Sequence, residues 1–127
     1  YIQMVLEYFP DGTLLDLVNE SRNQVQEELA ANIIKQILEA VSKLHQKRIV
    51  HCDIKPANIL IRKQENKIYE IVIADFGIAK VVPPGYLISN FKGTPTYMAP
   101  EVLSNNGFSF KADMFSIGSL MYNLLST

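Results

Sequence analysis

The sequence of 127 residues contains a single cysteine, Cys52, and no tryptophan. One cysteine excludes an internal disulfide and a zinc site built on several thiolates. No apolar run approaches the roughly 20 residues needed to span a bilayer, and the first residues lack the basic-then-apolar layout of a signal peptide. We therefore expect an intracellular, cytoplasmic protein without a transmembrane segment.

An excess of charge of one sign is also missing. Lysine and arginine number 12, aspartate and glutamate 13, and no long block carries a single sign. Binding to a nucleic acid backbone needs a basic surface, so we expect no nucleic-acid partner. The length suits one small domain with a single core. Nothing in the composition indicates an oligomeric state.

The spacing of apolar residues predicts two helices in the first half of the chain. Thr13 to Val18 is expected to form a short helix, with Thr13 as its N-cap. Residues 26 to 46 are expected to form a long helix with one core face, made of Leu29, Ile33, Ile37, Leu38, Val41 and Leu44. His45, close to the end of this helix, is interpreted as a last-turn residue stabilised by the helix dipole rather than as a ligand.

Short apolar runs predict three strands, at residues 2–6, 59–61 and 70–74. The polar segment from Arg62 to Tyr69 predicts a hairpin turn between the last two. Residues 77–94 have little periodicity and include Pro83-Pro84-Gly85, which favours a mobile loop. A helical turn is expected from Ala99-Pro100-Glu101, and residues 111–125 predict a helix that is buried on most faces.

A cluster of polar residue types stands out in the stretch His51-Cys52-Asp53-Ile54-Lys55-Pro56-Ala57-Asn58. It places a carboxylate, an amine and a carboxamide in one loop. A second carboxylate follows the third predicted strand, in Asp75-Phe76-Gly77, and the hairpin would hold Asn58 and Asp75 side by side. Such residues also serve as turn formers and caps, and for any single one that alternative stands. Together they indicate a site for a magnesium-bound phosphate ester.

Three motifs in this order, H-x-D-x-K-P-x-N, D-F-G and G-T-P-x-Y-M-A-P-E, resemble the eukaryotic protein kinases of the serine/threonine type. The resemblance covers the whole chain and implies an α+β, protein kinase-like fold. Residues 1–127 would form a partial domain: the hinge, the catalytic loop, the activation segment and the start of the central helix of the C-terminal lobe. The family's N-lobe glycine-rich loop and strand lysine, and its C-terminal helices, are absent from these residues.

The resemblance implies a role for each residue of the central cluster. Asp53 would orient a substrate hydroxyl and accept its proton, and Lys55 would steady the transferred phosphate. Asn58 and Asp75 would hold Mg²⁺ against the phosphates of ATP. His51 and Phe76 are expected to pack the two loops against each other.

The same resemblance implies an adenine site near the start of the chain. The backbone of Glu7 and Phe9 would bond the adenine edge, Leu6 would gate a deeper pocket, and Leu60 would lie beneath the ring. An ordinary buried strand is the alternative for this stretch.

Two segments imply serine and threonine residues of proteins as substrates, with dual specificity left open. One is Lys55-Pro56, and the other is Gly93-Thr94-Pro95, where Thr94 would contact Asp53 and Lys55 and position the substrate.

Cys52 departs from the family pattern, because many members have arginine before the catalytic aspartate to pair with a phosphate on the activation loop. Cysteine has no fixed positive charge, so we expect weak dependence on such phosphorylation. Ser89, the sole Ser or Thr between Phe76 and Lys92, is the candidate phosphosite. Asp113 is expected to tie down the backbone of the catalytic loop, and Phe115 to be a core aromatic.

The function expected of the parent protein is transfer of the ATP γ-phosphate to Ser/Thr hydroxyls, with the isolated chain inactive and prone to aggregate. The alternative is a pseudokinase that serves as a binding or scaffold module.

Overall fold

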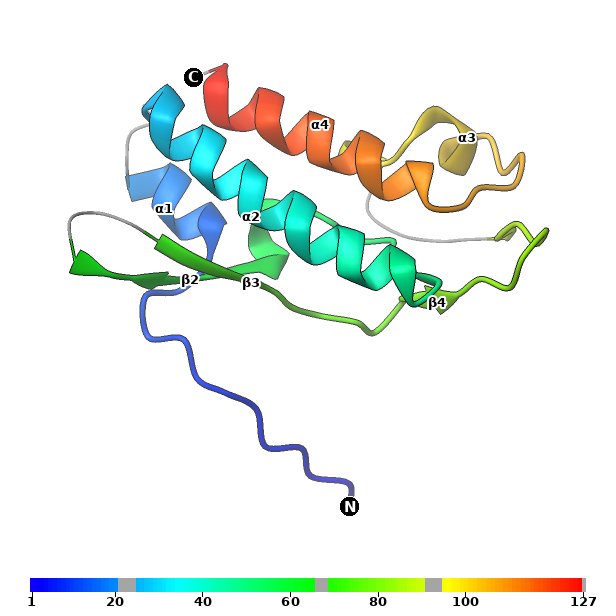
Figure 1. The fold of residues 1–127 in the computed structure, drawn as a ribbon, viewed down its shortest axis with the longest axis horizontal. Coiled ribbons are helices and arrows are strands. Elements are labelled where there is room, and N and C mark those ends of the chain that lie inside the picture. The colour runs from blue at the N-terminus through cyan, green and yellow to red at the C-terminus, as the bar shows by residue number, and fades with distance from the viewer. Residues whose placement is uncertain (21–24, 66–68, 91–94, 127) are drawn as a thin grey trace.

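In the computed structural model, the described residues are 1–20, 25–65, 69–90 and 95–126. Two long helices, α2 (Glu27–Gln46) and α4 (Lys111–Leu125), pack against each other, and α2 also packs against strands of two small sheets (Figure 1). Helices and antiparallel strands thus form one body, which confirms the α+β class. Among the described residues, no helix has both the length and the apolar content that crossing a membrane requires.

Both sheets are antiparallel pairs. In the first, β2 (Ile59–Lys63) pairs with β3 (Tyr69–Ile73), with Ile59 opposite Ile73. The predicted hairpin is therefore present, but the predicted turn was too long, because Arg62, Lys63 and Tyr69 belong to the strands. In the second sheet, β1 (Ile49–Val50) pairs with β4 (Lys80–Val81).

The second sheet corrects the prediction that residues 77–94 form only a loop. Besides β4, Ile88 in this segment makes an isolated antiparallel bridge with Phe108. Both pairings use backbone groups of short segments, so they leave no hydrophobic period in the sequence. These pairings form only because β1 and Phe108, which are distant in the sequence, lie beside this segment in the fold.

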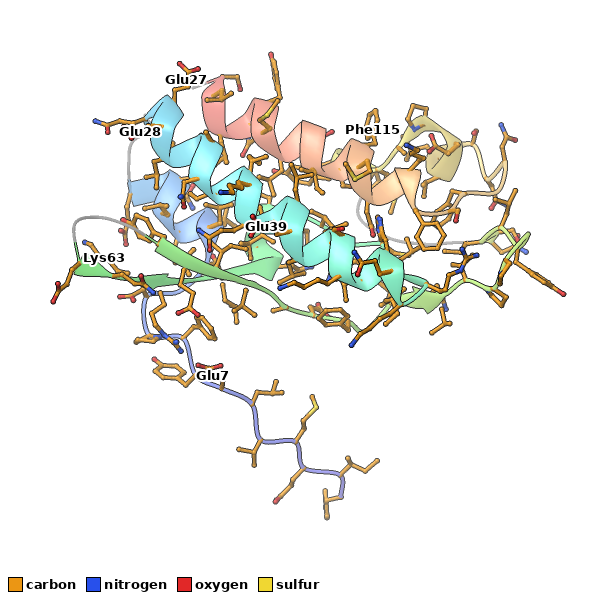
Figure 2. All side chains as sticks on the ribbon, viewed as in Figure 1. Glu7, Glu27, Glu28, Glu39, Lys63 and Phe115 are labelled. Carbon is orange, nitrogen blue, oxygen red and sulfur yellow. The ribbon has the colours of Figure 1, made fainter. Side chains whose placement is uncertain are left out.

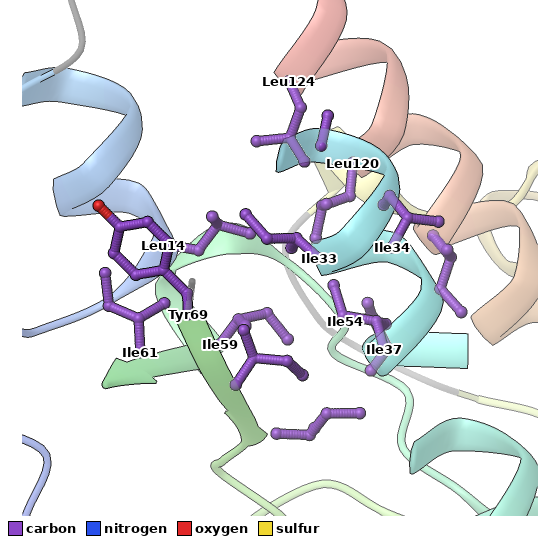
Figure 3. Close-up of a cluster of buried hydrophobic side chains, with 14 of the residues drawn as sticks. Leu14, Ile33, Ile34, Ile37, Ile54, Ile59, Ile61, Tyr69, Leu120 and Leu124 are labelled. Atoms are coloured by element: carbon purple, nitrogen blue, oxygen red, sulfur yellow. The ribbon is translucent and has the colours of Figure 1, made fainter. Parts of the chain in front are cut away.

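The core lies where one face of α2 meets α4, the β2–β3 hairpin and α1 (Leu14–Glu20), as Figure 3 shows. Helical spacing places the buried α2 residues on one stripe, as predicted. Leu38 was wrongly included in it, because its side chain is 38% exposed. The fully or nearly fully buried members of this stripe are Ala30, Ile33, Ile34, Ile37 and Val41.

Helix α4 has the predicted bounds but not the predicted burial on most faces. Its Leu120 and Leu124 are buried against the core, whereas Phe115 is 45% exposed and Tyr122 is also exposed. Figure 2 labels Phe115 on this helix. The prediction of a core aromatic at this position is wrong for the described structure, since α4 packs on α2 along one face and the helical period turns Phe115 away.

Residues 2–6 do not form the predicted strand. They belong to an exposed segment that leads away from the body of the molecule (Figure 1). A strand requires a neighbour for its backbone hydrogen bonds, and the described residues provide none for this stretch.

Two short predicted helices are confirmed. At the start of α1, the Thr13 hydroxyl accepts a hydrogen bond from Asp16 N–H at 3.3 Å, and the Asp16 carboxylate accepts one from Thr13 N–H at 2.8 Å. This reciprocal cap satisfies donors that the helix leaves open, as expected for a threonine N-cap. The second is α3 (Pro100–Leu103), which begins with the predicted proline.

Candidate active site

The loop that begins at His51 is fixed by one buried carboxylate, that of Asp113 in α4. Asp113 Oδ2 accepts a hydrogen bond from the backbone N–H of His51 at 2.9 Å, and Oδ1 accepts one from Cys52 N–H at 3.0 Å. Its side chain is only 1% exposed. A buried charge needs such donors, so the predicted structural role of Asp113 is confirmed.

His45 completes this anchor, which the sequence interpretation missed. Its Nε2 lies 2.8 Å from Asp113 Oδ2, and its ring packs edge-on against Phe110 with centroids 5.0 Å apart. The position of His45 near the end of α2 gave no signal of this contact, because Asp113 lies 68 positions away. The contact joins α2, α4 and the loop at a single carboxylate.

The side chain of His51 joins the loop to the segment that follows β3. Its Nε2 lies 3.0 Å from the carbonyl oxygen of Ala74, and its ring packs edge-on against Phe76 at 4.9 Å between centroids. His51 itself is fully buried. The predicted packing role of His51 and Phe76 is therefore confirmed, and it holds together the two loops that carry the polar residues.

Asp53, Lys55 and Asn58 form one contact group within the loop. Asn58 Nδ2 donates to Asp53 Oδ2 at 2.8 Å and to the Asp53 carbonyl oxygen at 2.9 Å. Lys55 Nζ lies 3.0 Å from the same Asp53 Oδ2. Asn58 is buried, whereas Asp53 and Lys55 are partly exposed, so the carboxylate is oriented by its neighbours and still accessible.

Asp75 reaches the same end of the hairpin as Asn58. The Ala74 N–H donates to the Asn58 carbonyl oxygen at 2.8 Å, which continues the β2–β3 register by one position. Asp75 follows immediately, with an exposed side chain whose Oδ1 accepts a hydrogen bond from Gly77 N–H at 3.1 Å. The strand pairing thus places Asn58 beside Ala74, the residue that precedes Asp75.

The donor types at this end of the hairpin suit a hard divalent cation. Carboxylate and amide oxygens are the ligands that Mg²⁺ takes, together with phosphate oxygens and water. Within the described ranges, no three His, Cys, Asp or Glu side chains cluster closely enough to hold a metal ion. A cation here would therefore need the Asn58 amide oxygen beside Asp75, and oxygens from a ligand.

Two residues of the site have backbone conformations that the sequence did not reveal. Cys52 has a φ of 70° and Asp75 a φ of 60°, in the left-handed region that non-glycine residues seldom adopt. Such strain is often found where a structure must aim a functional side chain. Here one strained residue immediately precedes Asp53, and the other is itself a candidate ligand.

Cys52 is a partly buried thiol. Burial, and secondly the negative charge of Asp113, raise the pKa of Cys52 from 9.0 to about 12. Removing water from around the group disfavours the thiolate, so the thiol stays protonated at neutral pH. This agrees with the interpretation of Cys52 as a small packed residue.

The predicted adenine site is only partly assembled. Phe9 is buried, with 8% of its surface exposed. Leu60 is partly buried on β2, where it forms an isolated antiparallel β-bridge with Thr13. Leu6, by contrast, is 70% exposed. Glu7 is ion-paired with Arg62, a residue that the sequence interpretation assigned only to a turn.

Of the two residues predicted in the activation segment, Thr94 lies outside the described residues. Ser89 is exposed and follows Ile88, whose backbone exchanges hydrogen bonds with Phe108 at 2.8 and 3.0 Å. After it, Asn90 N–H donates to Asn105 Oδ1 at 2.7 Å. Ser89 is therefore presented to solvent between two anchored neighbours.

Comparison with known proteins agrees with the geometry. The chain matches the family model of the protein kinase domain over residues 1–127. Myosin light chain kinase A of Dictyostelium discoideum is 41% identical over 124 residues, which are 98% of this chain and 41% of that protein. Human serine/threonine-protein kinase DCLK3 is 42% identical over 125 residues, covering 98% of this chain and 19% of the relative.

A third relative, human death-associated protein kinase 2, is 38% identical over 125 residues, again 98% of this chain, and 34% of its own length is covered. The chain thus spans less than half the length of each of these three proteins.

Proposed function

Because the chain belongs to the protein kinase domain family, we propose that it supplies the catalytic loop of an enzyme that transfers the γ-phosphate of ATP to serine or threonine hydroxyls of proteins. The observation that carries the proposal is the contact group of Asp53, Lys55 and Asn58, at the end of the hairpin where Asp75 also lies. Phosphoryl transfer depends chiefly on positioning and charge balance, and this group offers both.

Asp53 is the residue suited to the substrate hydroxyl. Its Oδ2 is held by Asn58 Nδ2 at 2.8 Å, so the carboxylate has a fixed orientation in which it accepts the hydroxyl proton. Lys55, 3.0 Å from the same oxygen, brings a positive charge to the place where the transferred phosphoryl group would carry its negative charge. Asp53 thus acts on the hydroxyl that receives the phosphoryl group, and Lys55 acts on the phosphoryl group itself.

Asn58 and Asp75 are the residues suited to hold Mg²⁺ with the nucleotide. Both bonds from Asn58 to Asp53 use the amide nitrogen, and the amide oxygen is the atom that binds cations. Asp75 is oriented by Gly77 N–H. When bound, the metal ion neutralises charge on the phosphates of ATP.

Serine and threonine specificity is supported by sequence and by the named relatives. Lys55-Pro56 and the G-T-P segment with Thr94 resemble the Ser/Thr class, and one relative is named as a serine/threonine-protein kinase. Residues 1–127 contain neither a glycine-rich phosphate loop nor the lysine that follows it in the family. We therefore expect these residues alone to transfer no phosphate.

The test uses the kinase that carries this chain, with labelled ATP, Mg²⁺ and a protein substrate rich in serine and threonine. Asp53→Asn should lower kcat about 100- to 1,000-fold while nucleotide binding is retained, since it removes the proton acceptor and its ion pair with Lys55 but leaves Asn58 and Asp75 unchanged. Glu39→Gln, an exposed carboxylate on α2, is the matched control and should leave kcat unchanged. Wild-type protein that binds nucleotide without transferring phosphate would instead support the pseudokinase alternative.

A further inference from the structure

Arg62 lies on the outer face of the β2–β3 hairpin, on the same side as Leu60. Alternate residues of a strand point to opposite faces, and β2 buries Ile59 and Ile61 in the core while Leu60 and Arg62 face the other way. Leu60 is the residue proposed to lie beneath adenine. Arg62 therefore stands two positions along the strand from the floor of the proposed nucleotide site.

Residues 7–13 form a segment that crosses this face. The guanidinium of Arg62 contacts two side chains of this segment. It forms an ion pair with Glu7, and its central carbon lies 4.4 Å from the centroid of the Phe9 ring. From the other strand, Glu70 Oε2 accepts a hydrogen bond from Arg62 at 3.1 Å. Figure 2 labels Glu7 on the segment as it approaches the sheet.

The next residues of the segment are attached to the same strand. Lys63 N–H donates to Asp11 Oδ2 at 2.8 Å, Ile61 N–H donates to the Gly12 carbonyl oxygen at 3.0 Å, and Thr13 forms a bridge with Leu60. Residues 1–8 are exposed. Among the described residues, Glu7 is thus the residue nearest the N-terminus whose side chain is held against the hairpin, and Arg62 is the residue that holds it.

We propose that Arg62 is a positioning residue for nucleotide binding, which holds Glu7 and Phe9 so that their backbone is fixed beside Leu60. A guanidinium is planar, has donors for two carboxylates at once, and offers its face to an aromatic ring. It therefore joins Glu70, Glu7 and Phe9 in one contact, which a lysine ammonium cannot do in the same geometry. This inference rests on the proposed function, because the backbone of Glu7 and Phe9 is where adenine would bind.

The experiment replaces Arg62 in the kinase that carries this chain. Arg62→Gln should raise the KM for ATP about fivefold, as expected for the loss of its exposed ion pair with Glu7 and its cation–π contact with Phe9, with kcat within about twofold of wild type. Arg62→Lys should raise the KM about twofold, because it keeps the charge and loses the planar contact. Lys63→Gln removes an equal charge from the adjacent, exposed side chain and should leave the KM unchanged.

A second readout separates this inference from the proposed function. Hydrogen exchange at the Ile61 amide, which donates to the Gly12 carbonyl oxygen of the same segment, should be faster without nucleotide in Arg62→Gln than in wild type and in Lys63→Gln. Unchanged exchange, or an unchanged KM in an active enzyme, would overturn the inference. Absence of phosphoryl transfer by the wild-type kinase, with faster exchange in the variant, would overturn the proposed function and leave the Arg62 contact established.

Discussion

Asp113 accepts a hydrogen bond from the backbone N–H of Cys52 at 3.0 Å, although the two residues are 61 positions apart. Cys52 has the left-handed φ of 70° and directly precedes Asp53. A strained residue of this kind costs about 1–3 kcal/mol, and charge-assisted hydrogen bonds to a buried carboxylate offset that cost. The direction in which the proposed catalytic carboxylate points therefore depends on α4.

Replacement of Asp113 should loosen the catalytic loop. Asp113→Asn loses the negative charge and one of the two oxygens that accept backbone hydrogen bonds, so we expect the free energy of unfolding to fall by about 3 kcal/mol. Urea denaturation measures this. Lys111→Gln, an exposed change in the same helix, should have an effect within about 0.5 kcal/mol. Equal stability of Asp113→Asn and wild type would show that the carboxylate is not the anchor.

Gln36 should stabilise the outer edge of β3. Its Nε2 donates to the Tyr69 carbonyl oxygen at 2.8 Å, and its Oε1 accepts a hydrogen bond from Ile71 N–H at 3.2 Å. Gln36→Ala removes both bonds and should lower the free energy of unfolding by about 1–2 kcal/mol, with faster amide exchange at Ile71. Lys35→Ala, the exposed neighbour on α2, is the control. If the Ile71 amide exchanged at the wild-type rate in Gln36→Ala, this role would be refuted.

The thiol of Cys52 should react slowly and make the fold sensitive to alkali. Burial raises the pKa of Cys52 from 9.0 to about 12, so between these values the unfolded state releases a proton that the folded state retains. The free energy of unfolding should therefore fall as pH rises above 9, and less steeply in Cys52→Ala. Iodoacetamide labelling at pH 8 should be slow until urea is added. Rapid labelling of the folded protein would contradict the raised pKa.

Phosphorylation of Ser89 should matter little for activity. Cys52 offers no fixed positive charge to a phosphate, and the segment around Ser89 is already attached through Ile88 and Asn90. Ser89→Ala in the kinase that carries this chain should retain kcat within about twofold, as measured by phosphate transfer to a protein substrate. A large loss of activity, together with phosphate detected on Ser89 of the wild-type protein, would count against this prediction.

Local patterns predicted much of the fold and the residues of the site. The spacing in α2, the threonine cap of α1 and the two hairpin strands are short-range signals, and the structure has each of them within a few residues of its predicted place. Pairing of the hairpin strands follows from their adjacency, so the neighbourhood of Asn58 and Asp75 could be predicted as well.

Structural features that depend on partners far away in the sequence could not be predicted from local patterns. Residues 2–6 have the composition of a strand, but among the described residues no strand lies beside them, and β4 has little pattern yet pairs with β1. His45 and Arg62 were assigned to a helix end and a turn, because their partners come from other segments.

The sequence by itself determined which residue types are present for phosphoryl transfer, their order, and the helices and hairpin that carry them. These follow from covalent spacing and from the periods of helix and strand. Only the tertiary structure decided that Asp113 holds the loop at Cys52, that Arg62 holds Glu7 and Phe9, and that Phe115 is exposed. Each of these depends on contacts between segments far apart in the chain, which local periodicity does not encode.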